Sequence, residues 1–322
     1  MATAATPAAG FIPDETWRAV RRANRVGAPF VGLVAPNVYE MEPVLKSPSF
    51  KPSDDIPILD VQGRRFRFGT IGGQRVVMVM TGLSMLNVGL TTQLLLSLFK
   101  VKGVVHWGIA GNVDDGLQIG DVTIPEYWAH LSLWVWQRHG DGPANELPLE
   151  AAGDYTREFG FLNFSDYTVF GHGQGNPADL AAASTLNSLW YQPEEIFPVS
   201  GTPEKRQHAF WVPVSKPYYA LAEKLEVTRV PRGCSGNIYV DNAGYRQSVR
   251  SQFQCTPWDM ESAAFALVAH QLGVPFLTFR SLSDPAGGDN EIATFLPIAA
   301  QNAVDVMLKF VSLLGAGEQA GM

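Results

Sequence analysis

Short apolar runs that end at turn residues recur along this chain and indicate buried β-strands. FVGLVA at 30–35 ends at Pro36, and VVMVM at 76–80 ends at Thr81-Gly82. The further strand candidates are the first part of GVVHWGIAG at 103–111, which runs into a glycine turn, then DVTIP at 121–125, HAFWVPV at 208–214, NIYV at 237–240, TPWDM at 256–260 and VPFLTFR at 274–280. Continuous apolar runs of this length are typical of strands that are buried on both faces.

Three segments between these runs have the spacing of amphipathic helices. Residues 85–99 place apolar side chains at 86, 90, 94, 95 and 98, and ESAAFALVAHQLG at 261–273 ends at Gly273, which suits a C-terminal cap. A last helix is predicted from about 291 to 314, with Phe295 on its apolar stripe. The alternation of strands and helices predicts an α/β sandwich.

The chain is predicted to form an N-terminal arm, residues 1–27, followed by a single domain, residues 28–322. The arm contains WRAVRRANR, whose arginines share one face at helical spacing and indicate a solvated surface. Within the domain, residues 130–205 are rich in Trp, Tyr, Gly and Asn, and we expect an elaborated loop region there.

Charge and composition narrow the classes of partner. The formal net charge is -7, which provides no field to attract nucleic acid or an anionic membrane. No apolar run approaches the roughly 18 residues of a membrane span, and the first ten residues lack the features of a secretory signal. We therefore expect a cytoplasmic protein with a small-molecule partner, no nucleic acid and no membrane.

The chain has 2 cysteines, Cys234 and Cys255, without the spacing of zinc ligands. We expect no metal site. Two buried thiols are the favoured interpretation, and a single disulfide stays open because the sequence does not give the distance between the two Cα atoms.

Polar residues at strand ends are the first candidates for chemistry, because ligands of α/β sheets bind where strand ends open into loops. The segment DMESAAFALVAHQLGVPFLTFRSLSD at 259–284 has an acidic helix start at Glu261 and a strand followed by Asp284. Taken alone, Glu261 is explained as a helix-start residue and Asp284 as a turn aspartate. Two carboxylates at such positions nevertheless suggest a site.

This segment resembles the signature of the purine nucleoside phosphorylase and methylthioadenosine nucleosidase superfamily, an ME pair at a helix start followed by a strand ending in R-x-x-S-D. VGLVAPNVYEME, TGLSMLNVGLTTQLLL and HWGIAGNVDDGLQIGDVTIP resemble other parts of that family, so the resemblance covers roughly residues 30–125 and 230–313. WAHLSLWVWQRHGDGPANEL and GDYTREFGFLNFSDYT resemble its plant branch of bark storage proteins and cytokinin-riboside phosphorylases. The resemblance implies a three-layer α/β/α sandwich of phosphorylase type around a central mixed β-sheet, no cofactor, and a homodimer or higher homo-oligomer.

The resemblance also assigns roles in the cleavage of the bond between a purine and ribose. Met260 and Glu261 would hold the ribose, with the Glu261 carboxylate accepting hydrogen bonds from its 2′ and 3′ hydroxyls. Asp284 would act as general acid at purine N7, Ser283 would orient it, and Arg280 would brace this loop.

The base would lie beside three residues that follow one another in the chain. Ile238, Tyr239 and Val240 match this part of the family, and Tyr239 could stack on a purine face. Ile292 and Phe295 are expected to close the pocket from the last helix.

The second substrate is ambiguous. Phosphorylases of the family bind phosphate through arginines and a hydroxyl residue that this chain lacks, since APNVYE has no arginine, His106 precedes the glycine turn and Ile109 occupies the hydroxyl position. Following the plant branch, we expect inorganic phosphate as co-substrate, held by Gly82, Ser84 and His106, so that adenosine-like nucleosides or cytokinin ribosides give free base and ribose 1-phosphate.

Two alternatives stay open. Glu40 matches the carboxylate that activates water in the nucleosidases, which favours hydrolysis. A vegetative storage protein that keeps the fold with decayed activity is the other alternative.

Overall fold

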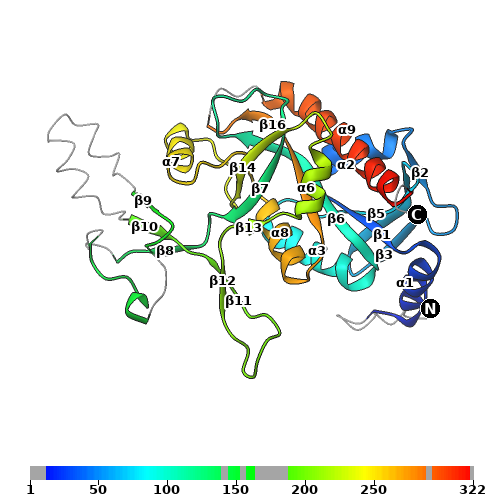
Figure 1. The fold of residues 1–322 in the computed structure, drawn as a ribbon, viewed down its shortest axis with the longest axis horizontal. Coiled ribbons are helices and arrows are strands. Elements are labelled where there is room, and N and C mark those ends of the chain that lie inside the picture. Colours follow the sequence, from blue (N-terminus) through cyan, green and yellow to red (C-terminus); the bar gives the residue numbers. More distant parts are fainter. Residues whose placement is uncertain (1–11, 139–143, 153–156, 164–187, 288–291, 320–322) are drawn as a thin grey trace, which may run out of the picture.

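The structure is a computed structural model that describes residues 12–138, 144–152, 157–163, 188–287 and 292–319 (Figure 1). One 11-stranded sheet runs through its centre in the order β13-β7-β14-β15-β6-β1-β5-β4-β2, with β16 paired to β6 and β7, and β3 paired to β4. The strands are β1 (Phe30–Ala35), β2 (Phe50–Pro52), β3 (Ile58–Val61), β4 (Arg64–Ile71), β5 (Gln74–Met80), β6 (Val101–Asn112), β7 (Val122–His130), β13 (Val212–Pro213), β14 (Thr228–Ser235), β15 (Trp258–Asp259) and β16 (Phe276–Pro285).

The sheet is mixed, and its parallel part sets the place of the site. β1 runs parallel to β5 and to β6, and β6 runs parallel to β16, while β4 is antiparallel to β5. The carboxyl ends of β1, β5, β6 and β16 therefore meet at one edge. All six residues of β1 are buried, as its continuous apolar run predicts.

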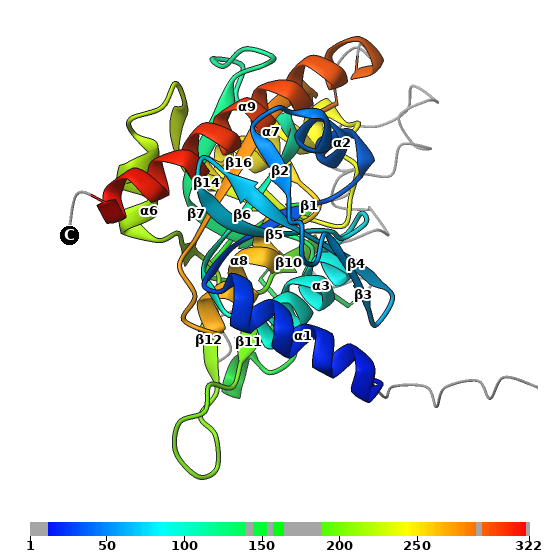
Figure 2. The ribbon, with the colours of Figure 1, turned by 90° about the vertical axis from the view of Figure 1, so that its right-hand side faces the viewer.

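Helices cover both faces of this sheet and complete three layers (Figure 2). The contacts place α3 against α8 on one face and α2 against α9 on the other. The helices of the central part are α1 (Asp14–Gly27), α2 (Val38–Lys46), α3 (Met85–Leu98), α6 (Lys216–Ala222), α7 (Ala243–Phe253), α8 (Ser262–Gln271) and α9 (Ile292–Gln319).

Helices α1 and α9 lie in different surroundings. Helix α1 packs Val20 and Ala23 into the main hydrophobic core, while its Arg22 reaches Asp55 on the surface. Helix α9 contains an apolar stretch, Thr294–Gly315, that is long enough to cross a membrane. Because α9 packs along β16 and β6, this stretch is explained as the core helix of a globular fold.

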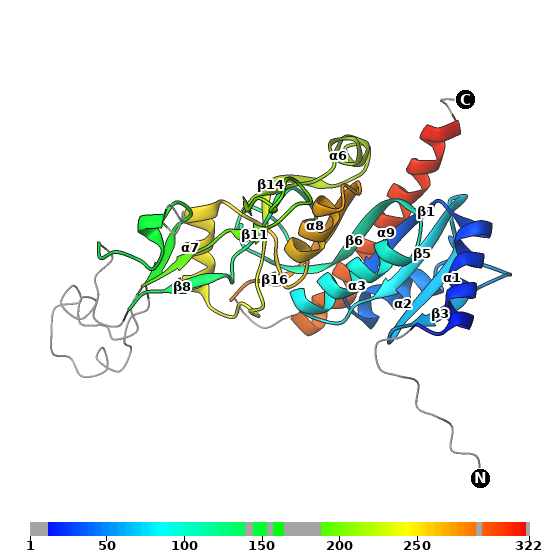
Figure 3. The same cartoon turned by 90° about the horizontal axis from the view of Figure 1, so that it is seen from below.

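Within the predicted elaborated region and just after it, the described residues form short strands that build an outlying part of the molecule. The strands β8 (Trp134–Trp136), β9 (Phe161–Asn163) and β10 (Ser188–Tyr191) form a small antiparallel sheet, β11 (Glu194–Ile196) and β12 (Gln207–Ala209) form a hairpin, and η1 (Glu150–Ala152) is a short 3₁₀ turn. A second apolar cluster, which includes Tyr191 and Phe253, joins this part to α7. In Figure 3, β8 and α7 lie at the opposite end of the molecule from α1.

Three predicted features differ in the structure. NIYV at 237–240 is not a strand, and the glycine turn predicted after residue 106 remains a strand to Asn112, because β16 pairs with it throughout. Cys234 and Cys255 form a disulfide, with their Cα atoms 6.0 Å apart, so the interpretation as two thiols is corrected.

Candidate active site

A cavity of about 140 Å³ opens at the edge where the parallel strands end. Its lining comes from the residues after β1, from the last residues of β6 and β16, and from the segment before α8, which are far apart in the chain. The lining residues are Pro36, Asn37, Glu40, Leu83, Ile109, Ala110, Gly111, Ile238, Tyr239, Val240, Trp258, Asp259, Met260, Glu261, Arg280, Ser283, Asp284 and Ala286. Most residues that the sequence assigned to ribose, base and acid therefore lie around one cavity.

Asp284 is placed and oriented by its neighbour. The Ser283 hydroxyl lies 2.6 Å from Asp284 Oδ1, to which it donates a hydrogen bond, and both residues are at the end of β16. Burial raises the pKa of Asp284, with a further contribution from the negative charge of Asp241, and the Ser283 hydrogen bond opposes this. A carboxyl with a raised pKa can deliver a proton to a leaving group.

Glu261 precedes the first residue of α8 and lines the cavity. Its Oε1 accepts a hydrogen bond of 3.0 Å from the backbone N–H of Ser84, and its Oε2 lies 3.5 Å from Nη2 of Arg280. Burial raises the pKa of Glu261, and the charge of Arg280 opposes the shift. The carboxylate is thus held in place by two partners while it faces the cavity.

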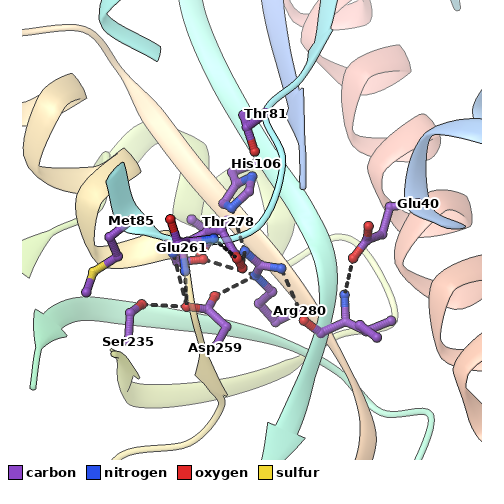
Figure 4. Close-up of polar contacts among 12 residues, drawn as sticks. Glu40, Thr81, Met85, His106, Ser235, Asp259, Glu261, Thr278 and Arg280 are labelled. Atoms are coloured by element: carbon purple, nitrogen blue, oxygen red, sulfur yellow. Dashed lines mark hydrogen bonds and ion pairs between the residues drawn. The ribbon is translucent and has the colours of Figure 1, made fainter. Parts of the chain in front are cut away.

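Arg280 is a fully buried cation at the centre of the polar network (Figure 4). Its Nε lies 2.7 Å from Asp259 Oδ2 and donates to the Ser262 hydroxyl at 3.0 Å, and its Nη1 donates to the Ile109 carbonyl at 3.1 Å. A buried guanidinium is stable only when its charge and its N–H groups are satisfied. Arg280 therefore links Asp259 and Glu261 beside the cavity.

Glu40 lies in the first turn of α2, on the side of Arg280 opposite Asp259 and Glu261 (Figure 4). Its Oε1 accepts from the Ile109 N–H at 3.3 Å, and its Oε2 accepts from the Asn37 N–H at 3.1 Å, which closes a capping box at the helix start. Burial raises the pKa of Glu40 to about 7, although Arg280 acts in the opposite direction. Glu40 can therefore accept a proton near neutral pH.

The residues expected to hold phosphate do not form a free anion site. His106 is fully buried and does not line the cavity; its Nδ1 lies 2.8 Å from the Val34 carbonyl, and its Nε2 accepts a hydrogen bond from Arg280. Burial, followed by the charge of Arg280, lowers the pKa of His106 well below its ordinary value, so the ring is neutral. This corrects the interpretation of His106 as an anion ligand.

The backbone of the turn after β5 is also engaged. The Gly82 N–H donates to the Pro36 carbonyl at 2.7 Å, and the Ser84 N–H donates to Glu261. Neither N–H is free to bind an oxyanion, which is the physical reason why the predicted cradle does not form.

The base-side residues come together as predicted, although not on a strand. Ile238, Tyr239 and Val240 line the cavity from an irregular segment that is fixed by the indole N–H of Trp258, which donates to the Ile238 carbonyl at 3.0 Å. Phe295 is half-buried but does not line the cavity, and the side chain of Ile292 lies outside the described residues.

Sequence reasoning missed Asp259 and Asn37. Asp259 Oδ1 accepts from the N–H groups of Glu261 and Ser262 at 3.1 and 3.0 Å, and also from the Ser235 hydroxyl. The available signals were an aspartate just before a helix and the N-x-x-E spacing of a capping box. Within the described part of the chain, no group of three or more His, Cys, Asp or Glu residues could hold a metal ion.

A cavity lined by carboxylates at the carboxyl edge of a mixed α/β sandwich is typical of proteins that bind small ligands, enzymes among them. The phosphorylase superfamily matches residues 30–312. The chain therefore belongs to the phosphorylase superfamily, which confirms the family predicted from the sequence.

Individual relatives agree with this assignment. Bark storage protein A of Populus deltoides is 25% identical over 302 residues, which are 88% of each chain. The 5′-methylthioadenosine/S-adenosylhomocysteine nucleosidase of Lysinibacillus sphaericus (strain C3-41) is 26% identical over 258 residues, 79% of this chain and 88% of the relative. The solved structure of the Helicobacter pylori enzyme of the same name has a TM-score of 0.60 at 19% identity and covers 88% of this chain and 98% of its own, which confirms the fold.

Proposed function

We propose that this protein is a hydrolytic nucleosidase that cleaves the N-glycosidic bond of purine nucleosides with water. The observation that carries the proposal is the buried Glu40 carboxylate, which lines the cavity opposite Asp284 and has a pKa raised to about 7. The similarity to nucleosidases supports the same reaction class.

In this reaction the two carboxyl groups act on opposite sides of the sugar. The Asp284 carboxyl gives its proton to purine N7, so that the C1′–N9 bond breaks and the base leaves neutral. The developing positive charge on the sugar is stabilised by Glu261, whose carboxylate binds the ribose diol. A water molecule forms the new bond to C1′ while Glu40 takes its proton, and the products are free base and free ribose.

Phosphorolysis is the reaction that the resemblance to the plant branch implies, and this geometry supports it less than hydrolysis. Arg280 is the one cation among the described residues that line the cavity, and its guanidinium is already engaged with Asp259, Ser262 and Ile109. A phosphate dianion at C1′ would meet Glu40 and Glu261 without a free positive charge to offset them.

The deciding experiment is a panel of purine nucleosides assayed with and without inorganic phosphate, with both sugar products identified. We expect free ribose at the same rate in either buffer, and loss of that release in Glu40→Gln. Glu42→Gln is the matched control, since Glu42 lies on the same helix but is exposed. Ribose 1-phosphate as the product would establish phosphorolysis, and absence of turnover on every nucleoside would favour a storage protein.

A further inference from the structure

A second, larger cavity lies directly beside the active-site cavity. Its volume is about 740 Å³, and we refer to it as the arginine groove. It is lined by the start of α2, the β3–β4 hairpin and the end of β5, with the residues Pro36, Asn37, Val38, Asp60, Gly63, Arg64, Arg65, Arg67, Met80, Thr81 and Gly82. Pro36 and Asn37 also line the active-site cavity, so the two cavities share a wall.

The groove has an excess of positive charge, with three arginines and one aspartate. Arg65 is neutralised by Asp60, which it contacts through two hydrogen bonds of 2.8 and 2.7 Å. Arg64 donates to the Thr81 carbonyl and, at 3.2 Å, to Asn87, both uncharged partners. The guanidinium of Arg64 therefore keeps its positive charge beside the groove.

Of the three arginines in the groove, Arg67 is the one that an anionic ligand would stabilise most. It is half-buried on β4, and within the described residues it has no hydrogen bond or ion pair to a carboxylate. Burial lowers the pKa of Arg67 and the nearby charge of Arg65 lowers it further, while the charge of Asp60 opposes the shift. A partly desolvated cation beside a like charge is stabilised by an anionic ligand.

The position of the groove relative to the reacting sugar indicates where such an anion would come from. Asn37 follows β1 and Asp284 is at the end of β16, and these two strands flank β6 on opposite sides. If Asp284 binds the base and Glu261 the ribose diol, the remaining end of the sugar, C5′, points towards the wall that Asn37 forms. This step rests on the proposed function.

We propose that the arginine groove binds an anionic group, phosphate or carboxylate, carried on the 5′ carbon of the nucleoside. The preferred substrates are then 5′-charged purine nucleosides, and the neutral nucleoside is a poorer substrate. Free inorganic phosphate has the same recognition chemistry, and the experiment separates it from a substrate-borne anion.

The test compares kcat/KM for adenosine, adenosine 5′-monophosphate and the 5′-carboxylate of adenosine in wild type and Arg67→Gln. We expect Arg67→Gln to reduce kcat/KM for both charged substrates about 10-fold or more, because a charge-assisted hydrogen bond is lost, with adenosine changed less than about twofold. Arg67→Lys should recover part of the loss. Arg18→Gln, which removes one exposed arginine of α1, is the matched control and should change none of these values.

Binding of adenosine 5′-monophosphate to the Glu40→Gln variant separates the two hypotheses, since it requires no turnover. Cleavage of neutral and 5′-charged nucleosides alike, with kcat/KM for the charged substrates unchanged in Arg67→Gln, would overturn the groove while the proposed function stands. Arg67-dependent binding of the nucleotide without cleavage of any nucleoside would support the groove and overturn the proposed function. Arg67-dependent stimulation by inorganic phosphate, with no preference for charged substrates, would assign the groove to a phosphate co-substrate and overturn our inference.

Discussion

Individual side chains carry the chemistry of this site because their surroundings shift their proton affinity. Asp284 and Glu40 are both carboxyl groups, yet one is at the end of β16 beside a serine and the other is in the first turn of a helix beside an arginine. Burial raises the pKa of each, that of Glu40 to about 7, and in the reaction that we propose one carboxyl group gives a proton and the other takes one.

Replacing Asp284 by Asn should reduce turnover far more than substrate binding, because the proton donor is needed chiefly in the transition state. General acid catalysis contributes roughly 10² to 10⁴-fold, and kcat should fall by this factor. The measurement is kcat in steady state beside Kd of a nucleoside by calorimetry. Near-normal turnover in Asp284→Asn would remove Asp284 from the mechanism.

The raised pKa of Glu40 predicts how the free energy of unfolding changes with pH. Its pKa is about 7 in the folded protein against an ordinary 4.5, so between these pH values the folded state holds a proton that the unfolded state has lost. The free energy of unfolding therefore falls as pH rises from about 4.5 to about 7. Glu40→Gln has no carboxyl group at this position and therefore avoids this loss. The free energy of unfolding of the variant minus that of wild type should be higher at pH 8 than at pH 4.5, by up to about 3 kcal/mol.

Urea unfolding of both proteins across this pH range measures the difference. Glu42→Gln, on the exposed face of α2, should show no such pH-dependent gain. A constant difference between Glu40→Gln and wild type at every pH would contradict the raised pKa.

At the scale of elements, the start of α8 joins backbone structure to the ligand site. Asp259 caps this helix through the N–H groups of Glu261 and Ser262 and pairs with Arg280 at 2.7 Å. The buried Asp259 carboxylate therefore holds two groups in place: Glu261, which we propose binds ribose, and Arg280 beside the cavity.

Asp259→Asn should be strongly destabilising, because it removes the nearer of the two carboxylates that pair with the buried guanidinium of Arg280. Loss of one partner of a buried ion pair costs roughly 3–5 kcal/mol. Denaturant unfolding gives this difference, and Asp305→Asn, on the exposed side of α9, serves as control. If Asp259→Asn unfolds with wild-type stability, Arg280 does not depend on Asp259.

The elements that the sequence predicted well are those whose apolar pattern survives in the fold. β1, β5, α8 and β16 bury the residues that their apolar patterns select, whereas α3 buries Leu95 and Leu98 of its predicted stripe and leaves Leu86 and Leu90 exposed. Helix α2 was not predicted, although Asn37 and Glu40 form a capping box at its start. Helix α7 was missed because only Val249 and Phe253 are buried among polar neighbours.

The site was predictable where local motifs carry it and not where long-range contacts do. Glu261, Ser283 and Asp284 lie within one recognisable segment, so their association with one cavity followed from the sequence. The neutral state of His106 depends on Arg280, 174 residues away in the chain, and no local pattern reports that contact. The same holds for the engagement of the Ser84 N–H by Glu261, which is 177 residues distant.

At the scale of the whole molecule, the active-site cavity borders the second hydrophobic cluster. The main core contains the sheet, whereas Val240, Trp258 and Ala286 belong to the second cluster that joins α7 and the outlying strands. All three residues line the cavity. One wall of the cavity is thus part of the second hydrophobic cluster, and Pro36, Asn37 and Glu40 form another wall at the end of β1 and the start of α2.

The surface beside the cavity leads to a prediction about assembly. Leu83, which lines the cavity, is 52% exposed, and Leu86 and Leu90, one turn apart on α3, are 69% and 60% exposed. Neighbouring large apolar side chains at this exposure are typical of protein interfaces. Since symmetric dimers are the commonest soluble oligomers, we expect a homodimer that covers this leucine face.

The Leu86→Asp/Leu90→Asp double variant should shift the protein from dimer to monomer, because the dimer interface would then bury charges without partners. Light scattering coupled to size-exclusion chromatography measures the mass of wild type and variant at equal concentration. Leu149→Asp is the control, since Leu149 is 70% exposed in the outlying part, far along the chain from α3. A wild-type protein that elutes as a monomer, or a double variant that remains dimeric, would show that the leucine face is not the interface.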